Sequence, residues 1–153
     1  MPWRSSPTAQ IRRLAKELQI FPKDNPPEVQ LSEHKTDDAI FVTIKCPQDT
    51  VFAGETYVLR FRFSDAYPMD SPEVVFVDKS PEHPHCYSNG HICLSVLGSM
   101  WTPAMTVHST ALSILSMLSS CKKKARPDGD MMYSARTSGS PKDTKWLYED
   151  DSV

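Results

Sequence analysis

The chain's potential for chemistry is concentrated in one short segment, residues 83–93, which reads HPHCYSNGHIC. Three of the five histidines and two of the four cysteines lie in this segment. So many imidazoles and thiols in one place suggest two kinds of chemistry: a metal site, or a reactive thiol with groups that position it. The spacing of the candidates distinguishes the two.

A metal site is the weaker interpretation. Structural zinc is held by four ligands, usually delivered as two pairs from separate turns. His83 and His85 could form one pair and His91 and Cys93 another, but all four are crowded into one segment, and neither cysteine outside it has a second ligand beside it. We therefore expect no metal ion, and a zinc-binding interaction module is the least favoured alternative.

A single reactive thiol fits the segment better, and Cys93 is the candidate. Ser88, Asn89 and Gly90 form a strong turn signal, which places Cys93 just after a bend on an extended, accessible stretch. The other cysteines lack this setting, and two of them end apolar elements, where thiols usually behave as small hydrophobic groups.

Bulk composition restricts the class of protein. A chain of 153 residues is an ordinary size for one domain. The net charge of -2 gives no reason to expect nucleic acid, and no apolar run approaches the roughly 20 residues that span a bilayer, so we expect neither nucleic acid nor a membrane as partner. Without a secretory signal or closely paired cysteines, the chain is expected to keep free thiols and to reside in the cytoplasm and nucleus.

The elements that must position Cys93 follow from apolar spacing. Residues 9–18 have the period of a helix, with Ile11 and Leu14 on its apolar face and Glu17 on another. Residues 103–121 carry a wide apolar stripe and predict a central core helix, capped near its start by Thr106.

Four runs between these helices have the alternation or the apolar content of β-strands, and their order predicts an antiparallel meander. They are residues 30–35, the weakest of the four, 39–46, 57–63 and 73–77. A helix, a set of strands, a long irregular segment and a second helix together predict an α+β domain.

The end of the chain has a different character. Residues 127–139 are rich in Gly, Ser, Asp and Met, which predicts an irregular segment, whereas Ser140 followed by a proline is typical of the start of a short helix. Trp146, Leu147 and Tyr148 then either dock on the domain, the interpretation we favour, or form an exposed contact site.

Four motifs, in this order, resemble the core of the ubiquitin-conjugating enzyme family. They are YPMDSP at 67–72, HPH at 83–85, NGHICL at 89–94 and WTPAM at 101–105. Cys93 lies eight residues after His85, and Trp101 lies eight residues after Cys93, as in that family. The resemblance covers about residues 8–122.

The resemblance implies a fold and a domain organisation. We expect residues 1–153 to form one ubiquitin-conjugating domain with an N-terminal helix, a four-stranded antiparallel meander, an active-site segment and a central helix. A variable, partly flexible tail at 127–153 would follow this core.

The resemblance also implies an activity. Members of the family accept ubiquitin from an activating enzyme as a cysteine thioester and pass it to a substrate amine. The activating enzyme uses the ATP, so no cofactor is expected here. Cys93 would be the nucleophile, the loop with His85 and Asn89 would offer hydrogen-bond donors to the oxyanion, and His83 would hold the loop. His91 is expected to be partly exposed and to influence the thiol only weakly.

The implied partners are ubiquitin, the activating enzyme, RING or U-box ligases and protein substrates. The positions that match the family's contacts to the activating enzyme and the ligases are Arg12, Arg13, Lys16, Met69, Thr102, Pro103 and Ala104. Met69 stands where Phe is commoner, and its flexible thioether could keep an apolar contact while changing which ligases fit.

Departures from the family pattern bear on the substrate. The family usually has Asn in place of His85, Asp in place of Ser95, and an acidic residue where this chain has Lys124 or Ala125. The W-type branch shares these departures, together with the sequences YSNGHICLS, SMLSSCK and TKW-x-Y-x-DD. Its members attach ubiquitin to the α-amino group of substrate N-termini.

Elementary acid–base chemistry agrees with the W-type resemblance. An α-amine loses its proton with a pKa about 2.5 units below that of lysine, which makes its neutral form about 3.5 kcal/mol easier to reach. A cleft without acidic groups could therefore still serve an α-amine, and we expect substrates with flexible N-termini. Two alternatives stay open: a lysine-directed enzyme, and a non-catalytic relative that only binds ubiquitin or a ligase, which Cys93 disfavours.

Overall fold

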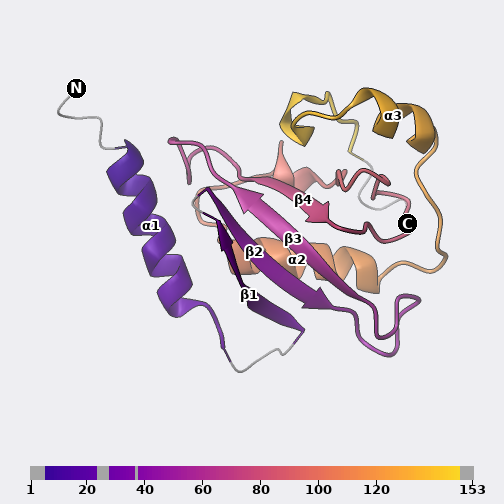
Figure 1. Cartoon of the computed structure of the whole chain (residues 1–153), viewed down its shortest axis with the longest axis horizontal. Coiled ribbons are helices and arrows are strands. Elements are labelled where there is room, and N and C mark those ends of the chain that lie inside the picture. The colour runs from indigo at the N-terminus through magenta and orange to yellow at the C-terminus, as the bar shows by residue number, and fades with distance from the viewer. Residues whose placement is uncertain (1–5, 24–27, 37, 149–153) are drawn as a thin grey trace.

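The computed structural model describes residues 6–23, 28–36 and 38–148. A four-stranded sheet lies at its centre, with α2 packed behind it, α1 at one side and α3 beyond β4 (Figure 1). The elements in chain order are α1 (Ser6–Ile20), β1 (Val29–Thr36), β2 (Ala39–Lys45), β3 (Thr56–Arg62), β4 (Glu73–Val77), η1 (Ser95–Leu97), α2 (Val107–Ser119), α3 (Asp130–Arg136) and η2 (Pro141–Asp143). None of the helices in these ranges has the length and apolar character that crossing a membrane requires.

The sheet confirms the predicted meander. Its strand order is β1-β2-β3-β4, with each strand antiparallel to the next. Val42 on β2 lies opposite Leu59 on β3, and Leu59 lies opposite Phe76 on β4. This register places Val42, Leu59 and Phe76 on one face, in the core that also contains Ile114 and Leu118 of α2.

The central helix confirms the predicted cap. Thr106 accepts a hydrogen bond from the backbone N–H of Ser109, and the Ser109 hydroxyl accepts one from the backbone N–H of Thr106. This reciprocal capping satisfies donors that the first turn of a helix otherwise leaves unpaired. The helix therefore begins at Val107, later than the expected residue 103, and buries Ile114 and Leu118 completely.

Helix α1 forms as predicted, but its apolar face does not supply its most deeply buried described side chain. Ile11 is 62% exposed, whereas Glu17 is only 4% exposed. The Glu17 carboxylate accepts hydrogen bonds from Arg13 Nε at 2.8 Å, the Tyr67 hydroxyl at 2.6 Å and the backbone N–H of Val107 at 2.7 Å. Burial together with this carboxylate raises the pKa of Tyr67. A charged hub therefore joins α1 to the start of α2, which apolar spacing does not reveal.

The segment after Pro127 also differs from the expectation. An irregular segment was predicted, yet residues Asp130–Arg136 form α3. Asp130 opens this helix, where a negative charge complements the helix dipole, and its carboxylate accepts a hydrogen bond from the backbone N–H of Ser88 at 2.8 Å. Contacts to a distant turn thus stabilise a helix that local composition does not favour.

We expect the Glu17 hub to contribute strongly to stability. Replacing Glu17 by Ala leaves the Tyr67 hydroxyl and the Val107 N–H buried without their acceptor, so the free energy of unfolding should fall by about 3 kcal/mol. Urea denaturation measures this loss. Glu82→Ala removes the same group from an exposed position and should change stability by less than about 0.5 kcal/mol. Equal losses of unfolding free energy in the two variants would contradict a stabilising role for the Glu17 hub.

Candidate active site

The four cysteines have different environments. Cys46, Cys86 and Cys121 are buried free thiols, whereas Cys93 is partly exposed. Burial raises the pKa of the Cys46 thiol to about 11 and raises the pKa of the Cys86 thiol as well. Because the thiolate is the nucleophile, burial makes these groups inert. Cys93 is the thiol that a macromolecular reagent can reach.

The turn before Cys93 is attached to the edge of the sheet. Tyr87 N–H donates to the His91 carbonyl at 2.9 Å, and Gly90 N–H donates to the Tyr87 carbonyl at 3.0 Å. The Gly90 carbonyl then accepts from Phe76 on β4 at 2.9 Å. Gly90 has a φ of 94°, and a Cβ there would collide with the Phe76 carbonyl. Only glycine therefore fits this turn, which gives Cys93 a rigid support.

His85 clamps the backbone of Cys93. The His85 carbonyl accepts a hydrogen bond from the Cys93 N–H at 2.8 Å, and its ring Nδ1 lies 3.1 Å from the Cys93 carbonyl oxygen. A carbonyl only accepts, so Nδ1 carries the proton of this bond. The role expected for His85 was a donor to the oxyanion. Here its Nδ1–H holds the backbone of Cys93 instead.

His83 lies at the centre of the loop and is fully buried. Its Nδ1 accepts a hydrogen bond from the His85 N–H at 2.9 Å, and its Nε2 donates to the Met117 carbonyl of α2 at 3.2 Å. Burial, reinforced by the neighbouring His85, lowers the pKa of His83 to about 4. The neutral ring therefore joins the active-site loop to the core helix.

The buried His83 predicts a pH dependence of stability. Its pKa is about 4 in the folded chain and about 6.5 in the unfolded chain, so the unfolded chain binds the extra proton between these values. The stabilisation is complete above pH 6.5 and is lost as the pH falls towards 4. From pH 7 to pH 5 this group alone should cost about 2 kcal/mol.

Urea denaturation of wild type and His83→Gln at both pH values measures this effect. The variant keeps the buried His91 and the half-buried His108, whose pKa values burial also lowers. Its stability should therefore fall less steeply than that of wild type between pH 7 and pH 5. Parallel pH profiles in the two proteins would show that His83 does not titrate in this way.

Asn89 and His91 form hydrogen bonds with the C-terminal part of the chain. Asn89 donates from Nδ2 to the Thr137 carbonyl at 2.9 Å, and its Oδ1 accepts from the His91 N–H at 3.1 Å. His91 Nδ1 lies 2.7 Å from the Tyr133 hydroxyl. His91 is 4% exposed, so the expectation of a partly exposed neighbour was wrong. The Asn89 amide, predicted to face the oxyanion, thus binds the segment after α3.

A cleft of about 430 Å³ opens beside Cys93. Its lining residues are Pro84, His85, Tyr87, Cys93, Ala125, Arg126, Pro127, Asp128 and Leu147. The Arg126 guanidinium is occupied by backbone carbonyls, at 2.7 Å from Pro81 and 2.9 Å from Ser80. Asp128 is the one carboxylate among the lining residues.

Sequence reasoning missed Asp128. Lys124 or Ala125 stands where the family has an acidic residue, so a cleft without acidic groups was expected. The position of Asp128 in the cleft contradicts this expectation. Lys124 faces away and pairs with Glu55 at 2.6 Å, while Ala125 lines the cleft. The only signal was the Pro127-Asp128-Gly129 turn, which brings a carboxylate back towards the loop.

The histidines do not gather into a metal site. Within the part of the chain that the structure describes, no group of three or more His, Cys, Asp or Glu side chains is arranged to hold a metal ion. His83 in particular uses both ring nitrogens within the fold, one towards His85 and one towards Met117.

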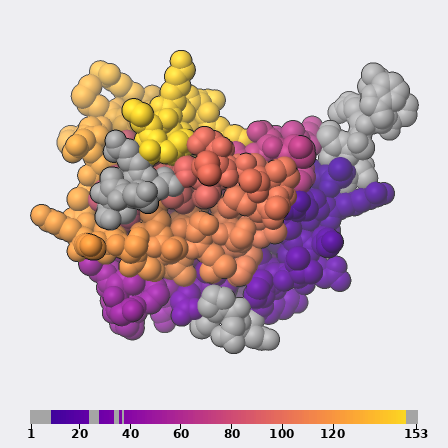
Figure 2. All heavy atoms as spheres, turned by 180° about the vertical axis from the view of Figure 1, so that it is seen from behind, coloured from indigo at the N-terminus to yellow at the C-terminus, as the bar shows by residue number. Residues whose placement is uncertain are grey.

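The positions expected to contact other proteins lie on two linked loops and α1. Met69 is 74% exposed, residues 102–104 are exposed, and Trp101 Nε1 donates to the Pro68 carbonyl at 2.9 Å, which joins the two loops. Figure 2 shows the coral segment of the second loop beside α1 in indigo.

The basic residues of α1 differ in their availability. Arg12 and Lys16 are exposed. Arg13 instead bonds Glu17 and donates from Nη2 to the Met105 carbonyl at 2.7 Å. Arg13 therefore anchors the helix, and its exposed neighbours are the residues that another protein can reach.

The match to known sequences decides the family. The profile described as "Ubiquitin-conjugating enzyme" matches residues 13–147, which include the second half of α1, the sheet, Cys93 and its cleft. The chain belongs to the ubiquitin-conjugating enzyme family. The resemblance and the predicted α+β fold are thereby confirmed, and the chain is a transferase that acts with ubiquitin, an activating enzyme and ligases.

Relatives named for the W type match nearly the whole chain of this conjugating enzyme. "Probable ubiquitin-conjugating enzyme E2 W" of Dictyostelium discoideum is 46% identical over 143 residues, covering 93% of this chain and 96% of the relative. "Ubiquitin-conjugating enzyme E2 W" of Caenorhabditis elegans is 44% identical over 149 residues, covering 95% and 98%.

Solved structures agree with the fold. The crystal structure of the ubiquitin-conjugating enzyme UbcA1 from Agrocybe aegerita matches with a TM-score of 0.79 at 41% identity, covering 85% of this chain and 96% of that one. A ubiquitin-conjugating enzyme from Plasmodium falciparum matches with a TM-score of 0.67 at 40% identity, covering 72% and 99%.

Proposed function

We propose that Cys93 carries ubiquitin as a thioester and transfers it to the N-terminal α-amino group of substrate proteins. The observation that carries the first half is the contrast among the thiols. Cys93 is partly exposed beside an open cleft, whereas the other three cysteines are buried.

The reaction divides into two acyl transfers. The Cys93 thiolate attacks the carbonyl carbon of the ubiquitin thioester on the activating enzyme, and the thiolate of that enzyme leaves. The substrate amine then attacks the new thioester, the C–N bond forms, the C–S bond breaks, and the amine loses its proton to solvent. ATP is consumed by the activating enzyme, so the conjugating enzyme needs no cofactor for either step.

Two features support the α-amine as acceptor. His85 and Ser95 replace the Asn and Asp that most of the family carries, and the relatives named E2 W match almost the whole chain. With fewer groups to activate a lysine, the acceptor with the lower pKa has the advantage.

Lysine transfer is the second candidate, and Asp128 favours it. A carboxylate in the cleft could hold a lysine ammonium group near the thioester and stabilise the positive charge that develops on nitrogen during attack. The same carboxylate could hold an α-ammonium group, so a direct comparison of the two acceptors is needed.

We propose that RING or U-box ligases dock on the two linked loops that carry Met69 and Pro103. Both residues are exposed, and the hydrogen bond between Trp101 and Pro68 holds the loops together. Substrates with flexible N-termini would then reach the cleft beside Cys93. The cytoplasm and nucleus are the compartments proposed for this activity.

We expect a covalent adduct through Cys93. Incubation with activating enzyme, ATP and ubiquitin should give an adduct of about one ubiquitin mass that a reducing agent cleaves, as read on non-reducing gels. Cys121→Ala removes a buried thiol and should form the ubiquitin adduct as readily as wild type. The same reducible adduct with Cys93→Ala would overturn the assignment of the nucleophile.

We expect the acceptor to be an α-amine. Two flexible peptides make the comparison, one with a free N-terminus and arginine for every lysine, the other acetylated at its N-terminus with one lysine. Single-turnover discharge at pH 7 should be at least about tenfold faster with the first, because far more of its amine is neutral. Faster discharge onto the acetylated peptide would replace this proposal with lysine transfer.

A further inference from the structure

The last described residues of the chain cross the cleft beside Cys93. The Cys93 Sγ donates a hydrogen bond to the Leu147 carbonyl at 3.5 Å, and Leu147 lines the cleft. When an acyl group is bonded to Sγ, the thiol has no hydrogen to donate, and the Leu147 carbonyl oxygen then faces the acyl group. This arrangement therefore suits the enzyme with a free Cys93 thiol, and it must open when Cys93 carries an acyl group as a thioester.

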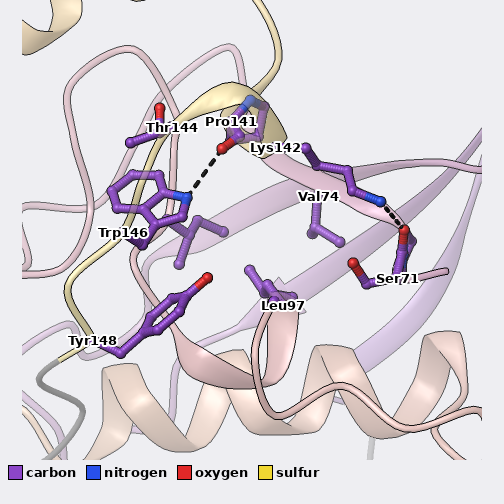
Figure 3. Close-up of a pocket in the computed structure, with 11 residues that line it drawn as sticks. Ser71, Val74, Leu97, Pro141, Lys142, Thr144, Trp146 and Tyr148 are labelled. Carbon is purple, nitrogen blue, oxygen red and sulfur yellow. Dashed lines mark hydrogen bonds between the residues drawn. The ribbon is translucent and has the colours of Figure 1, made fainter.

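Lys142 is one of the contacts that hold this segment to the body of the domain, and the 2.9 Å hydrogen bond between Thr144 and the Tyr133 hydroxyl is another. Lys142 Nζ donates to the Ser71 carbonyl at 2.6 Å and lies 3.2 Å from the Asp70 carboxylate. Figure 3 shows Lys142 reaching Ser71 on one side of a cavity and Trp146 bonded back to Pro141 on the other. The Lys142 side chain is 33% exposed and that of Asp70 is 51% exposed, so water and salt can compete for the ion pair.

The packing beneath this segment is incomplete. A cavity of about 110 Å³ separates Trp146 and Tyr148 from Val74 and Leu97. Gly98 lies so close to Tyr148 that a Cβ on it would collide with the Tyr148 hydroxyl oxygen. Elsewhere the segment is held by Trp146, whose ring lies 5.8 Å from that of Tyr87 and 5.6 Å from that of Tyr133. An element with a void beneath it and an exposed ion pair can separate at modest cost.

We propose that residues 140–148 form a lid over the Cys93 cleft, and that Lys142 is a positioning residue that latches it to the loop at Asp70 and Ser71. The closed lid covers one side of the partly exposed thiol, and the open lid admits the acyl group. Asp70 of the latch follows Met69, which is 74% exposed, so a protein that binds Met69 lies next to the latch.

Alkylation of Cys93 by iodoacetamide tests the lid without ubiquitin, so its outcome does not depend on the proposed substrate specificity. The rate is followed on the full chain by mass spectrometry of the Cys93 peptide. Lys142→Met keeps the apolar stem but removes the latch, and it should raise the rate about threefold, as expected for loss of a half-exposed charged contact. Lys145→Met is the matched control, because Lys145 is an exposed lysine of the same lid, and it should react like wild type.

Two further measurements distinguish a change in the accessibility of Cys93 from a change in the acidity of its thiol. High salt should accelerate wild type and Lys145→Met but not Lys142→Met, because only the latch is screened. The midpoint of the pH–rate profile should be the same in all three proteins. If Lys142→Met reacts at the wild-type rate, or if its midpoint shifts while Lys145→Met keeps that of wild type, the lid is wrong.

Gly98→Ala provides a variant that leaves every charge in place. Its Cβ would displace Tyr148 from the cavity wall and open the lid, so alkylation should again be faster than in wild type. The midpoint of the pH–rate profile should stay at the wild-type value. Circular dichroism identifies a variant that has lost the fold. An unchanged alkylation rate in a folded Gly98→Ala protein would contradict the proposal.

Discussion

Both ring nitrogens of His83 are used by the fold, one by the chain that leads to Cys93 and one by the core helix. Because the ring is buried and neutral, this pair of hydrogen bonds keeps the active-site loop at a defined distance from α2. His85, two residues on, then clamps Cys93 by its carbonyl and its ring. The reactive thiol is thus presented by a short chain of hydrogen bonds that begins in the core.

The same loop is also the foundation for the C-terminal part of the chain. The turn before Cys93 supplies Ser88, Asn89 and His91 as partners for residues of α3 and the segment after it. Cys93 and the segment that contacts it through Leu147 therefore share one support. Any change that loosens this turn should affect both the position of the thiol and its covering.

The cleft combines features that point to different acceptors. His85 and Ser95 depart from the wider family, but Asp128 returns a carboxylate to the cleft wall from a later turn. Lost acidic groups therefore cannot explain specificity by themselves. In the proposed transfer, the acceptor amine has to fit beside Asp128 and Tyr87 in the cleft as well as have a suitable pKa.

Sequence alone determined the meander, the central helix with its Thr106 cap, the family and the candidate nucleophile, because each depends on periodicity, capping or motif spacing between near neighbours. Tertiary structure decided the burial of Glu17, the helix α3 and the arrival of Asp128 at the cleft. Glu17 meets Val107 from 90 residues away, and Asp130 meets Ser88 from 42. Composition within a short window does not register such contacts, so the burial of Glu17 was not predicted and a helix was assigned to an irregular segment.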